Sequence, residues 1–417
     1  MNQNIESQTA SLDHDVCVIL PDDVLAGALR RFGLSDPSQL RISYLPGPGD
    51  VVGSFNYWQD RRHDVRVPCI AYSTMFFELV SQLGAQAQII SAVGLPDTTH
   101  PQITFAHVKP PVWQSRREFF QTQKIYTTAL VSAVADFDPH IVVASSDVPE
   151  HAWSALGGSS VLILSQHNSF WPQGQSRFNP KRIRKTLRVW RHGRHLEDAV
   201  CISHECQRQL AGISAGRLTA EVAVPQVIQH YPARNSRRAR RLLYLGRIEE
   251  NKGIFLLLEA VAALSEKFDD ISLVFAGSGG AEDVLHQRIA GLGNPHIQFL
   301  GRLPSQGVHA QIAQSDILVC PTMSSFNEGL AVVGFEAAAH GVPSILSSVV
   351  PAAELLGNSC LVFDADNQAE LTQKILRFVG DTQSYQDAVA HLSGVRDQIY
   401  DRSLSWGSQL ARVLARL

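Results

Sequence analysis

From about residue 41 the chain alternates short apolar runs with longer amphipathic segments. The apolar runs are rich in β-branched residues and nearly continuous, which is typical of parallel strands covered on both faces by helices. In the first half of the chain the predicted strands are RISYL, RVPCIAYS, AQIISAVG, HIVVASS, SVLILSQHN and AVCISHE, with a helix over MFFELVSQLG. This pattern predicts a doubly wound α/β domain.

The same alternation restarts after a basic stretch, ARNSRRARR at 233–241, which we interpret as a linker. The second set of predicted strands is LLYLGR, ISLVFAGSGG, IQFLGRL, DILVCPT, PSILSS and CLVFDAD. We therefore predict two Rossmann-like α/β domains facing across a cleft, at 1–235 and 236–400, and a C-terminal helix at 401–417 that can pack back on the first domain. In such sheets ligands bind at the carboxyl ends of the strands.

Composition narrows the class of protein. A length of 417 residues favours two domains over a single core, and a net charge of −3 does not indicate nucleic-acid binding. No apolar run reaches the roughly 18 residues of a membrane span, and the first fifteen or so residues are a polar tail without the pattern of a secretion signal. Six scattered cysteines without a Cys-x-x-Cys pair indicate reduced thiols rather than disulfides or zinc ligands. We predict a cytoplasmic protein.

Two glutamates stand in the stretch FNEGLAVVGFEAAAHGVPS, namely Glu328 and Glu336. If both were helical they would be about 12 Å apart, which exceeds the roughly 5–9.5 Å of the carboxyl pair in glycoside hydrolysis. Two different roles on one ligand fit better. A helix that begins near Gly329 would direct its free N–H groups at an anion, usually a phosphate. The alternative is that both are surface carboxylates.

A second stretch, GRIEENKG from Gly246 to Gly253, follows a predicted strand and opens a helix. Arg247 and Lys252 would stand at the carboxyl edge of the sheet, where a diphosphate needs cations. Taken singly, each could equally be a solvated loop residue.

Together these stretches resemble family 4 retaining glycosyltransferases of the GT-B fold, and the similar order of motifs extends through the C-terminal half. The resemblance implies that Arg247 and Lys252 bind the donor diphosphate and that Glu328 holds hydroxyls of the donor sugar. It also implies that the amides of Gly329 and Leu330 bind phosphate oxygen and that Glu336 binds the ribose. Two glycines, Gly246 and Gly277, complete the donor site that it implies.

The N-terminal half, where such enzymes bind the acceptor, is less similar. GPGDVVG resembles the first glycine loop of the family, which places Gly47 and Gly49 near the donor phosphates and the acceptor. SQHNSFWP resembles the segment with an active-site histidine, so His167 is the candidate, although a histidine at a strand end is often structural. Two departures from the family pattern are Ala331, where Gly or Pro is frequent, and Gly-Pro-Gly in place of paired glycines.

The resemblance further implies transfer of a hexosyl group with retention of configuration and with no cofactor or metal. The donor would be a nucleoside-diphosphate sugar, and the acceptor a hydroxyl of a glycan, a lipid-linked glycan or a small molecule. The catalytic residues would be His167, Arg247, Lys252 and Glu328, and the leaving diphosphate itself would take the acceptor's proton. No metal site is apparent from the residues either, since His192 and His195 lack partners at ligand spacing.

One basic segment, RFNPKRIRKTLRVWRHGRH at 177–195, interleaves cations with Ile183, Leu187 and Trp190. Such a helix could lie on an anionic membrane, for instance the inner face of a cell membrane, or could simply be a solvated basic helix.

Other classes of function remain open. A dinucleotide-dependent oxidoreductase is disfavoured because Pro48 removes an amide from the glycine loop. In FAGSGG, Ala276 replaces the first glycine of a hydrolase nucleophile elbow, so Ser278 is better explained by a turn. A non-catalytic protein that binds nucleotide sugars is the remaining alternative.

Overall fold

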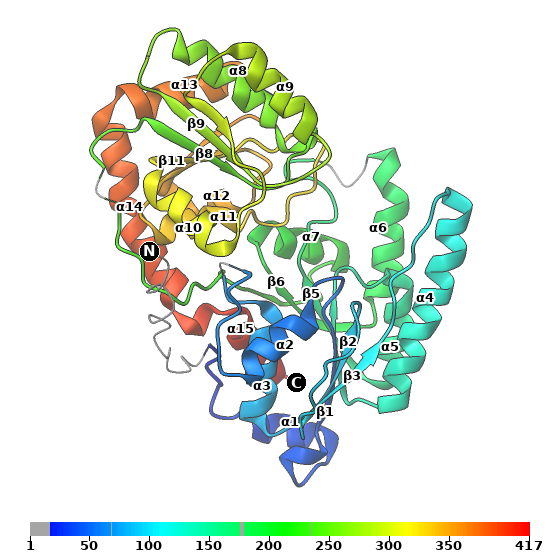
Figure 1. Ribbon diagram of the computed structural model, residues 1–417. Helices are drawn as coiled ribbons and strands as arrows, with labels where there is room; N and C mark the ends of the chain where they lie inside the picture. The colour runs from blue at the N-terminus through cyan, green and yellow to red at the C-terminus, as the bar shows by residue number, and fades with distance from the viewer. Residues whose placement is uncertain (1–16, 68, 176–178, 235) are drawn as a thin grey trace.

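The computed structural model describes residues 17–67, 69–175, 179–234 and 236–417. The predicted N-terminal tail and Arg177 of the basic segment lie outside the described residues. Figure 1 shows two α/β domains, one above the other, each built on its own parallel sheet. The strands are almost entirely buried because helices cover both faces of each sheet, which explains why their sequences are continuously apolar.

The N-terminal sheet has seven parallel strands in the order β3-β2-β1-β4-β5-β6-β7. Its strands are β1 (Arg41–Leu45), β2 (Gln86–Ser91), β3 (Ile103–His107), β4 (Ile141–Ser145), β5 (Val161–Gln166), β6 (Leu196–Cys201) and β7 (Ala220–Val222). The helices that accompany it are α1 (Val24–Phe32), α2 (Val51–Gln59), α3 (Tyr72–Leu83), α4 (Arg116–Phe137), α5 (Trp153–Ser159), α6 (Pro180–Gly193) and α7 (His204–Ser214).

The C-terminal sheet has six parallel strands in the order β10-β9-β8-β11-β12-β13. These are β8 (Arg241–Leu245), β9 (Ser272–Ala276), β10 (Ile297–Phe299), β11 (Ile317–Cys320), β12 (Ser344–Ser347) and β13 (Cys360–Phe363). The helices are α8 (Ile254–Ser265), α9 (Glu282–Leu292), α10 (Ser305–Gln314), α11 (Val333–Ala339), α12 (Ala352–Leu356), α13 (Gln368–Gly380) and α14 (Thr382–Tyr400). Both strand orders place a reversal of winding between β1 and β4 and between β8 and β11, where α/β sheets bind ligands.

The last helix, α15 (Trp406–Ala415), returns to the N-terminal domain and packs against α1, α3, β6 and β7. Figure 1 shows α14 leading from the upper, C-terminal domain down to α15 in the lower, N-terminal domain. Trp406 is fully buried against the ring of Tyr44, 5.8 Å away, and Ser405 Oγ donates to the carbonyl oxygen of Cys17 at 2.8 Å. The end of the chain is therefore part of the N-terminal core.

Two features of the N-terminal half differ from the sequence prediction. RVPCIAYS is not a strand, because residues 66–67 and 69–71 are in turns or irregular backbone and helix α3 begins at Tyr72. Two strands that the pattern did not reveal, β3 and β7, occupy the two edges of the sheet, where only one neighbour pairs with each and most side chains are not fully buried. An edge strand needs no continuous apolar run, so its pattern is weak.

The basic stretch at 233–241 is fastened to the C-terminal domain through one buried carboxylate. Asp316 is 3% exposed and pairs with the guanidinium of Arg234 at 2.7 Å. It also accepts the backbone N–H groups of Arg240 and Arg241, both at 2.9 Å. A buried carboxylate needs these partners to offset its lost hydration, so part of the predicted linker is held in place.

Candidate functional site

The predicted site residues lie where the two domains face each other. Arg247 follows β8, Glu328 lies on the loop after β11, and His167 follows β5 of the other domain. Asn327 Nδ2 donates to the carbonyl oxygen of Ser169 at 2.8 Å, across the domain boundary. Because these loops all leave the carboxyl ends of parallel strands, the two topologies bring them to one place.

An ion pair between Lys252 and Glu328 is the centre of the C-terminal side. Lys252 Nζ lies 2.5 Å from Glu328 Oε2, and the two side chains are only 14% and 13% exposed. Thr322 Oγ1 donates to the same carboxylate oxygen at 3.2 Å, and the ring of Phe326 lies 4.0 Å from Lys252 Nζ. A ligand that offers an anion to Lys252 or a hydrogen-bond donor to Glu328 can exchange partners with this pair.

Gly253 sets the position of this pair. It has φ +72° and ends the 3₁₀ turn Glu250–Lys252. A Cβ at this position would lie 1.8 Å from the carbonyl oxygen of Pro321, so only glycine allows the two segments to approach. The glycine thereby brings Lys252 from the β8 side within reach of Glu328 on the β11 side.

A second cation, Arg247, reaches into the same space from the end of β8. Its guanidinium pairs with Glu249 at 2.9 Å and lies 5.1 Å from the ring of Phe326. Its side chain is 55% exposed, so the guanidinium is free to turn from Glu249 toward a ligand.

Next to Arg247 is an open cavity of about 470 Å³, and the predicted residues Gly246 and Gly277 line it. A Cβ on Gly277 would lie 1.7 Å from the carbonyl oxygen of Gly246, so the two strand ends touch through backbone alone. Arg302 also lines this cavity and was missed by sequence reasoning. The signal was present, because Leu-Gly-Arg ends the strand at 300–302 just as it does at 245–247.

The prediction of a helix beginning near Gly329 is wrong. Helix α11 begins at Val333, so Glu328 is not helical and the helical separation of the two glutamates does not apply. The intervening Ala331 has φ +66°, a conformation that costs free energy in a non-glycine residue and that explains why the turn replaces helix here. Among the described residues the N–H groups of Gly329 and Leu330 have no hydrogen-bond acceptor, so they are free to bind an anion.

Glu336 lies inside α11 and is only 8% exposed. Loss of hydration raises the pKa of its carboxyl to about 7. Its neighbour from the N-terminal domain is Cys69, whose Sγ lies 4.0 Å from Glu336 Oε1. The carboxyl therefore faces the domain boundary and lacks the strong donors that a buried carboxylate requires.

On the N-terminal side, His167 is held by a short chain of hydrogen bonds. Trp406 Nε1 donates to Ser165 Oγ at 2.8 Å, and Ser165 Oγ lies 2.9 Å from His167 Nε2. Ser165 Oγ accepts from the indole, and we assign the serine's own proton to the bond with Nε2, which places the imidazole proton on Nδ1. Burial lowers the pKa of His167 to about 4, so the ring is neutral at pH 7.

Gly329 and His167 approach each other through the backbone, since a Cβ on Gly329 would lie 2.2 Å from the carbonyl oxygen of His167.

The predicted glycine loop, GPGDVVG, also makes a close contact at one of its glycines. Gly47 has φ +90°, and a Cβ there would lie 2.8 Å from Asp147 Oδ2. Gly49, in contrast, has open space around it. Asp147 was not a sequence candidate, because its stretch HIVVASSD carries no motif and only the sheet brings it beside Gly47.

Several buried oxygens around the site lack partners. Within the described part of the chain, Asn251 Oδ1, Asn327 Oδ1 and Gln166 Oε1 accept no hydrogen bond, and each residue adjoins Lys252, Glu328 or His167 in sequence. Buried polar atoms are nearly always paired, so these three amide oxygens beside the site are exceptions. The described residues contain no cluster of three potential metal ligands among His, Cys, Asp and Glu side chains.

Comparison with known proteins agrees with this geometry. Residues 214–391 match the family model of glycosyl transferases group 1. Over 114 residues, 27% of this chain and 29% of the relative, the sequence is 34% identical to phosphatidyl-myo-inositol mannosyltransferase of Mycobacterium leprae. Over 167 residues, 39% of this chain and 42% of the relative, it is 30% identical to O-antigen chain mannosyltransferase B of Escherichia coli. The matched regions thus span less than half the length of these relatives.

The fold is shared over a greater length. Sucrose-phosphate synthase of Thermosynechococcus elongatus superposes with a TM-score of 0.68, covering 90% of this chain and 98% of that one at 14% identity. Anabaena HepE in complex with UDP gives a TM-score of 0.62, covering 91% and 100% at 15% identity. The chain has the GT-B fold over the 90–91% that these structures cover, and residues 214–391 match the family model of glycosyl transferases group 1.

Proposed function

We propose that this protein is a retaining glycosyltransferase. It would move a hexosyl group from a nucleoside-diphosphate sugar to a hydroxyl of a glycan, a lipid-linked glycan or a small molecule. The observation that carries the proposal is the half-buried pair of Lys252 and Glu328, set beside Arg247 and the free amides of Gly329 and Leu330. A diphosphate needs cations and N–H donors, and a sugar needs a carboxylate acceptor, and both kinds of group meet here.

In the proposed reaction Lys252 exchanges Glu328 for the donor diphosphate, and Glu328 turns to hydroxyls of the donor sugar. The bond between the anomeric carbon and the diphosphate oxygen breaks while the acceptor oxygen bonds to the same face of that carbon. The acceptor's proton passes to the leaving diphosphate oxygen. Lys252, Arg247 and the two amides stabilise the charge that develops on that oxygen, which requires no metal or cofactor.

The other two residues would orient the donor. Neutral His167 carries its free proton on Nδ1 and can donate a hydrogen bond to the sugar without adding charge. The carboxyl of Glu336 would accept the two ribose hydroxyls, which would replace the strong donors that it lacks.

The test is a thermal-shift panel with UDP, GDP, ADP, dTDP and CMP. A ligand at about 100 times its Kd stabilises the protein by roughly 2.7 kcal/mol. We expect one diphosphate to raise the Tm of the wild type and of Lys267→Ala, an exposed lysine of the same domain. Lys252→Ala should lose the shift and the transfer activity together.

Two outcomes would contradict the proposal. If no nucleoside diphosphate raises the Tm, the donor site does not exist. If a diphosphate binds and depends on Lys252 while no sugar is transferred from the corresponding nucleotide sugar to any acceptor class, the protein is a non-catalytic nucleotide-sugar binder.

A specific observation also supports peripheral contact with a membrane. On α6 the apolar side chains of Ile183, Leu187 and Trp190 are 41%, 57% and 62% exposed, and they lie about one helical turn apart. Cations flank them, among them Arg184 and Arg188. Among the described residues no helix is long and apolar enough to cross a bilayer. We propose that α6 lies on an anionic surface with its apolar side chains inserted.

Sedimentation with vesicles tests this contact. The wild type should sediment at low salt with vesicles that contain phosphatidylglycerol, and not with phosphatidylcholine alone. The double variant L187S/W190S should stay in solution. V284S/L292S, which changes two apolar residues on α9 that are each 44% exposed, should behave as the wild type. Equal binding to both vesicle types would exclude the contact.

A further inference from the structure

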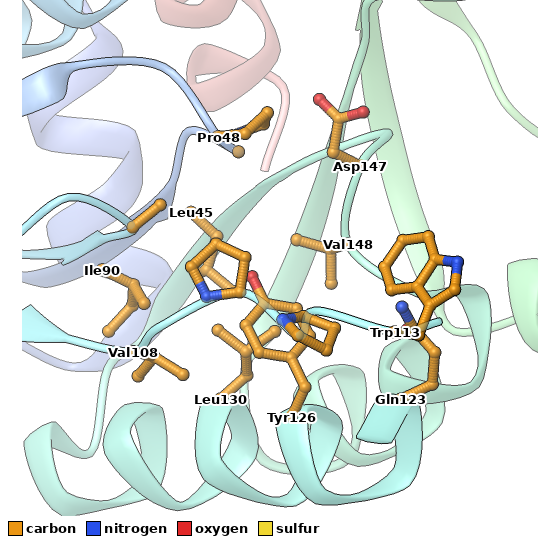
Figure 2. A pocket seen from close by; sticks show the side chains of 14 residues that line it. Leu45, Pro48, Ile90, Val108, Trp113, Gln123, Tyr126, Leu130, Asp147 and Val148 are labelled. Carbon is orange, nitrogen blue, oxygen red and sulfur yellow. The ribbon is translucent and has the colours of Figure 1, made fainter. Parts of the chain in front are cut away.

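An apolar cavity of about 220 Å³ lies in the N-terminal domain between the carboxyl ends of the strands and helix α4. Leu45 ends β1, Ile90 lies in β2 and Val108 follows β3, while Leu130 comes from α4. Figure 2 shows these side chains gathered around one space, with Tyr126 of α4 beside them. The proposed transfer chemistry does not use this cavity.

The order of the strands places the cavity next to the reacting centre. His167 follows β5, Asp147 follows the neighbouring β4, and Gly47 follows β1, which is next in the sheet. Gly47 and Asp147 line the cavity, which continues from there over β2 and β3. A ligand that reaches His167 with one end can therefore enter the cavity with the other.

The charged group of the cavity, the carboxylate of Asp147, lies at its rim. Asp147 is exposed, and in the described part of the chain its carboxylate has no hydrogen-bond partner. The protein around it nevertheless removes enough water to raise the pKa of that carboxyl above its usual range. Figure 2 shows Asp147 on the far side of Val148 from the apolar floor. A hydroxyl-bearing group would bind at Asp147, while the rest of the lining is mainly apolar, with the hydroxyl of Tyr126 and the amide of Gln123 among its other polar side-chain groups.

The cavity continues into a second hollow of about 330 Å³, because Val108, Pro111 and Tyr126 line both. The second hollow follows α4 outward to Ile125, which is 70% exposed. Trp113 forms part of the wall of the first cavity. Its ring contacts that of Phe119 edge-on, with centroids 4.9 Å apart. The two hollows lie side by side along α4 and form a mainly apolar path that opens to solvent, with His107, Lys109 and Thr122 lining its outer part.

We infer that this path binds a hydrocarbon chain of the acceptor, whose hydroxyl-bearing end lies at Asp147 and faces His167. The inference rests on the proposed function and narrows its acceptor to one with an alkyl or prenyl chain. A cavity of about 150 Å³ lined by aliphatic side chains stays dry and takes up benzene, so a larger apolar cavity gains from a hydrocarbon. Two adjoining hollows favour a chain over a single ring, and the mainly aliphatic and proline lining disfavours a second sugar, most of whose hydroxyls would go unpaired.

Calorimetric titration of the full chain tests the inference without requiring activity. The probes are n-octyl, phenyl and methyl glycosides of glucose, galactose and mannose, each below its micelle concentration. Burial of about two added methylenes gives about tenfold tighter binding, so at least one octyl glycoside should bind at least that much more tightly than its methyl partner. Ala92→Phe, which fills the cavity, should abolish the difference. Val93→Phe, its exposed neighbour in sequence, should keep it.

Each alternative outcome overturns the inference. Equal affinity for octyl and methyl glycosides would show that no chain is bound. An octyl preference that survives in Ala92→Phe would place the chain elsewhere, for instance on α6. Phenyl glycosides that bind as tightly as octyl would indicate a flat aglycone instead. The nucleotide-induced shift in Tm, measured on the same variants, shows that they are folded. It also separates failure of the inference from failure of the proposed function, because that shift depends on the donor site around Lys252 and not on the cavity.

Discussion

The two halves of the chain place their site residues in different ways. In the C-terminal half, Arg247 and Lys252 share one turn, and Glu328 and Glu336 share one loop and the helix after it. In the N-terminal half, the side chains around His167 come from the ends of separate strands and from α15 at the other end of the chain. Short motifs therefore reveal the first site, whereas only the folded sheet reveals the second.

The largest expected effect concerns the C-terminal site. In Glu328→Gln the amide keeps only one neutral acceptor oxygen in place of two charged ones for the sugar hydroxyls, and we expect kcat/KM to fall about 10²–10³-fold. Nucleotide affinity should stay equal or rise, because Lys252 loses its competing partner. Steady-state kinetics and titration with the diphosphate measure the two quantities. Glu259→Gln, an exposed glutamate on α8, is the matched control. A parallel loss of nucleotide affinity would show that Glu328 serves the diphosphate rather than the sugar.

The next effect concerns Glu336, whose pKa is raised to about 7 by burial. Below about pH 4.5 the carboxyl is protonated in both states and burial costs nothing. Above about pH 7 it is ionised in both, and the folded state bears the full cost. The wild type should therefore lose about 3 kcal/mol of unfolding free energy relative to Glu336→Gln as the pH rises between these limits. Denaturant unfolding at several pH values gives the difference, and a constant difference would contradict the shifted pKa.

Much of the fold and of the donor site could be predicted, for a physical reason. Strands buried on both faces must be apolar throughout, so all six strands of the C-terminal sheet had a clear pattern, while the edge strand β3 did not. Gly277 was predicted from the motif that contains it, although the backbone contact with Gly246 that requires glycine there joins the ends of two strands. The late start of α11 depends on the positive φ of Ala331, a residue whose identity predicts the opposite. Asp147 and the apolar cavity follow from the neighbours of β4 in the sheet, which no local pattern encodes.

A smaller effect tests the contact between the C-terminal helix and the N-terminal site. In Trp406→Phe the donor to Ser165 is lost, so His167 is less firmly oriented and we expect kcat to fall about tenfold at unchanged donor KM. Trp153→Phe is a close control, because within the described residues the indole N–H of this buried tryptophan has no partner. Ser165→Ala should cost as much as Trp406→Phe, and the double variant no more than either one. Additive losses would show that Trp406 acts through packing instead.

The smallest effect separates two glycines that the sequence could not distinguish. Gly47 has φ +90° and would direct a Cβ at Asp147 Oδ2, whereas Gly49 has neither a positive φ nor a neighbour within 4 Å. We expect Gly47→Ala to lower the free energy of unfolding by about 1–2 kcal/mol and Gly49→Ala by less than about 0.5 kcal/mol. Because the added methyl would displace Asp147, Gly47→Ala should also weaken binding of octyl glycosides while the nucleotide-induced shift in Tm persists. If Gly47→Ala and Gly49→Ala changed stability and octyl glycoside affinity equally, the contact between Gly47 and Asp147 would not be the cause.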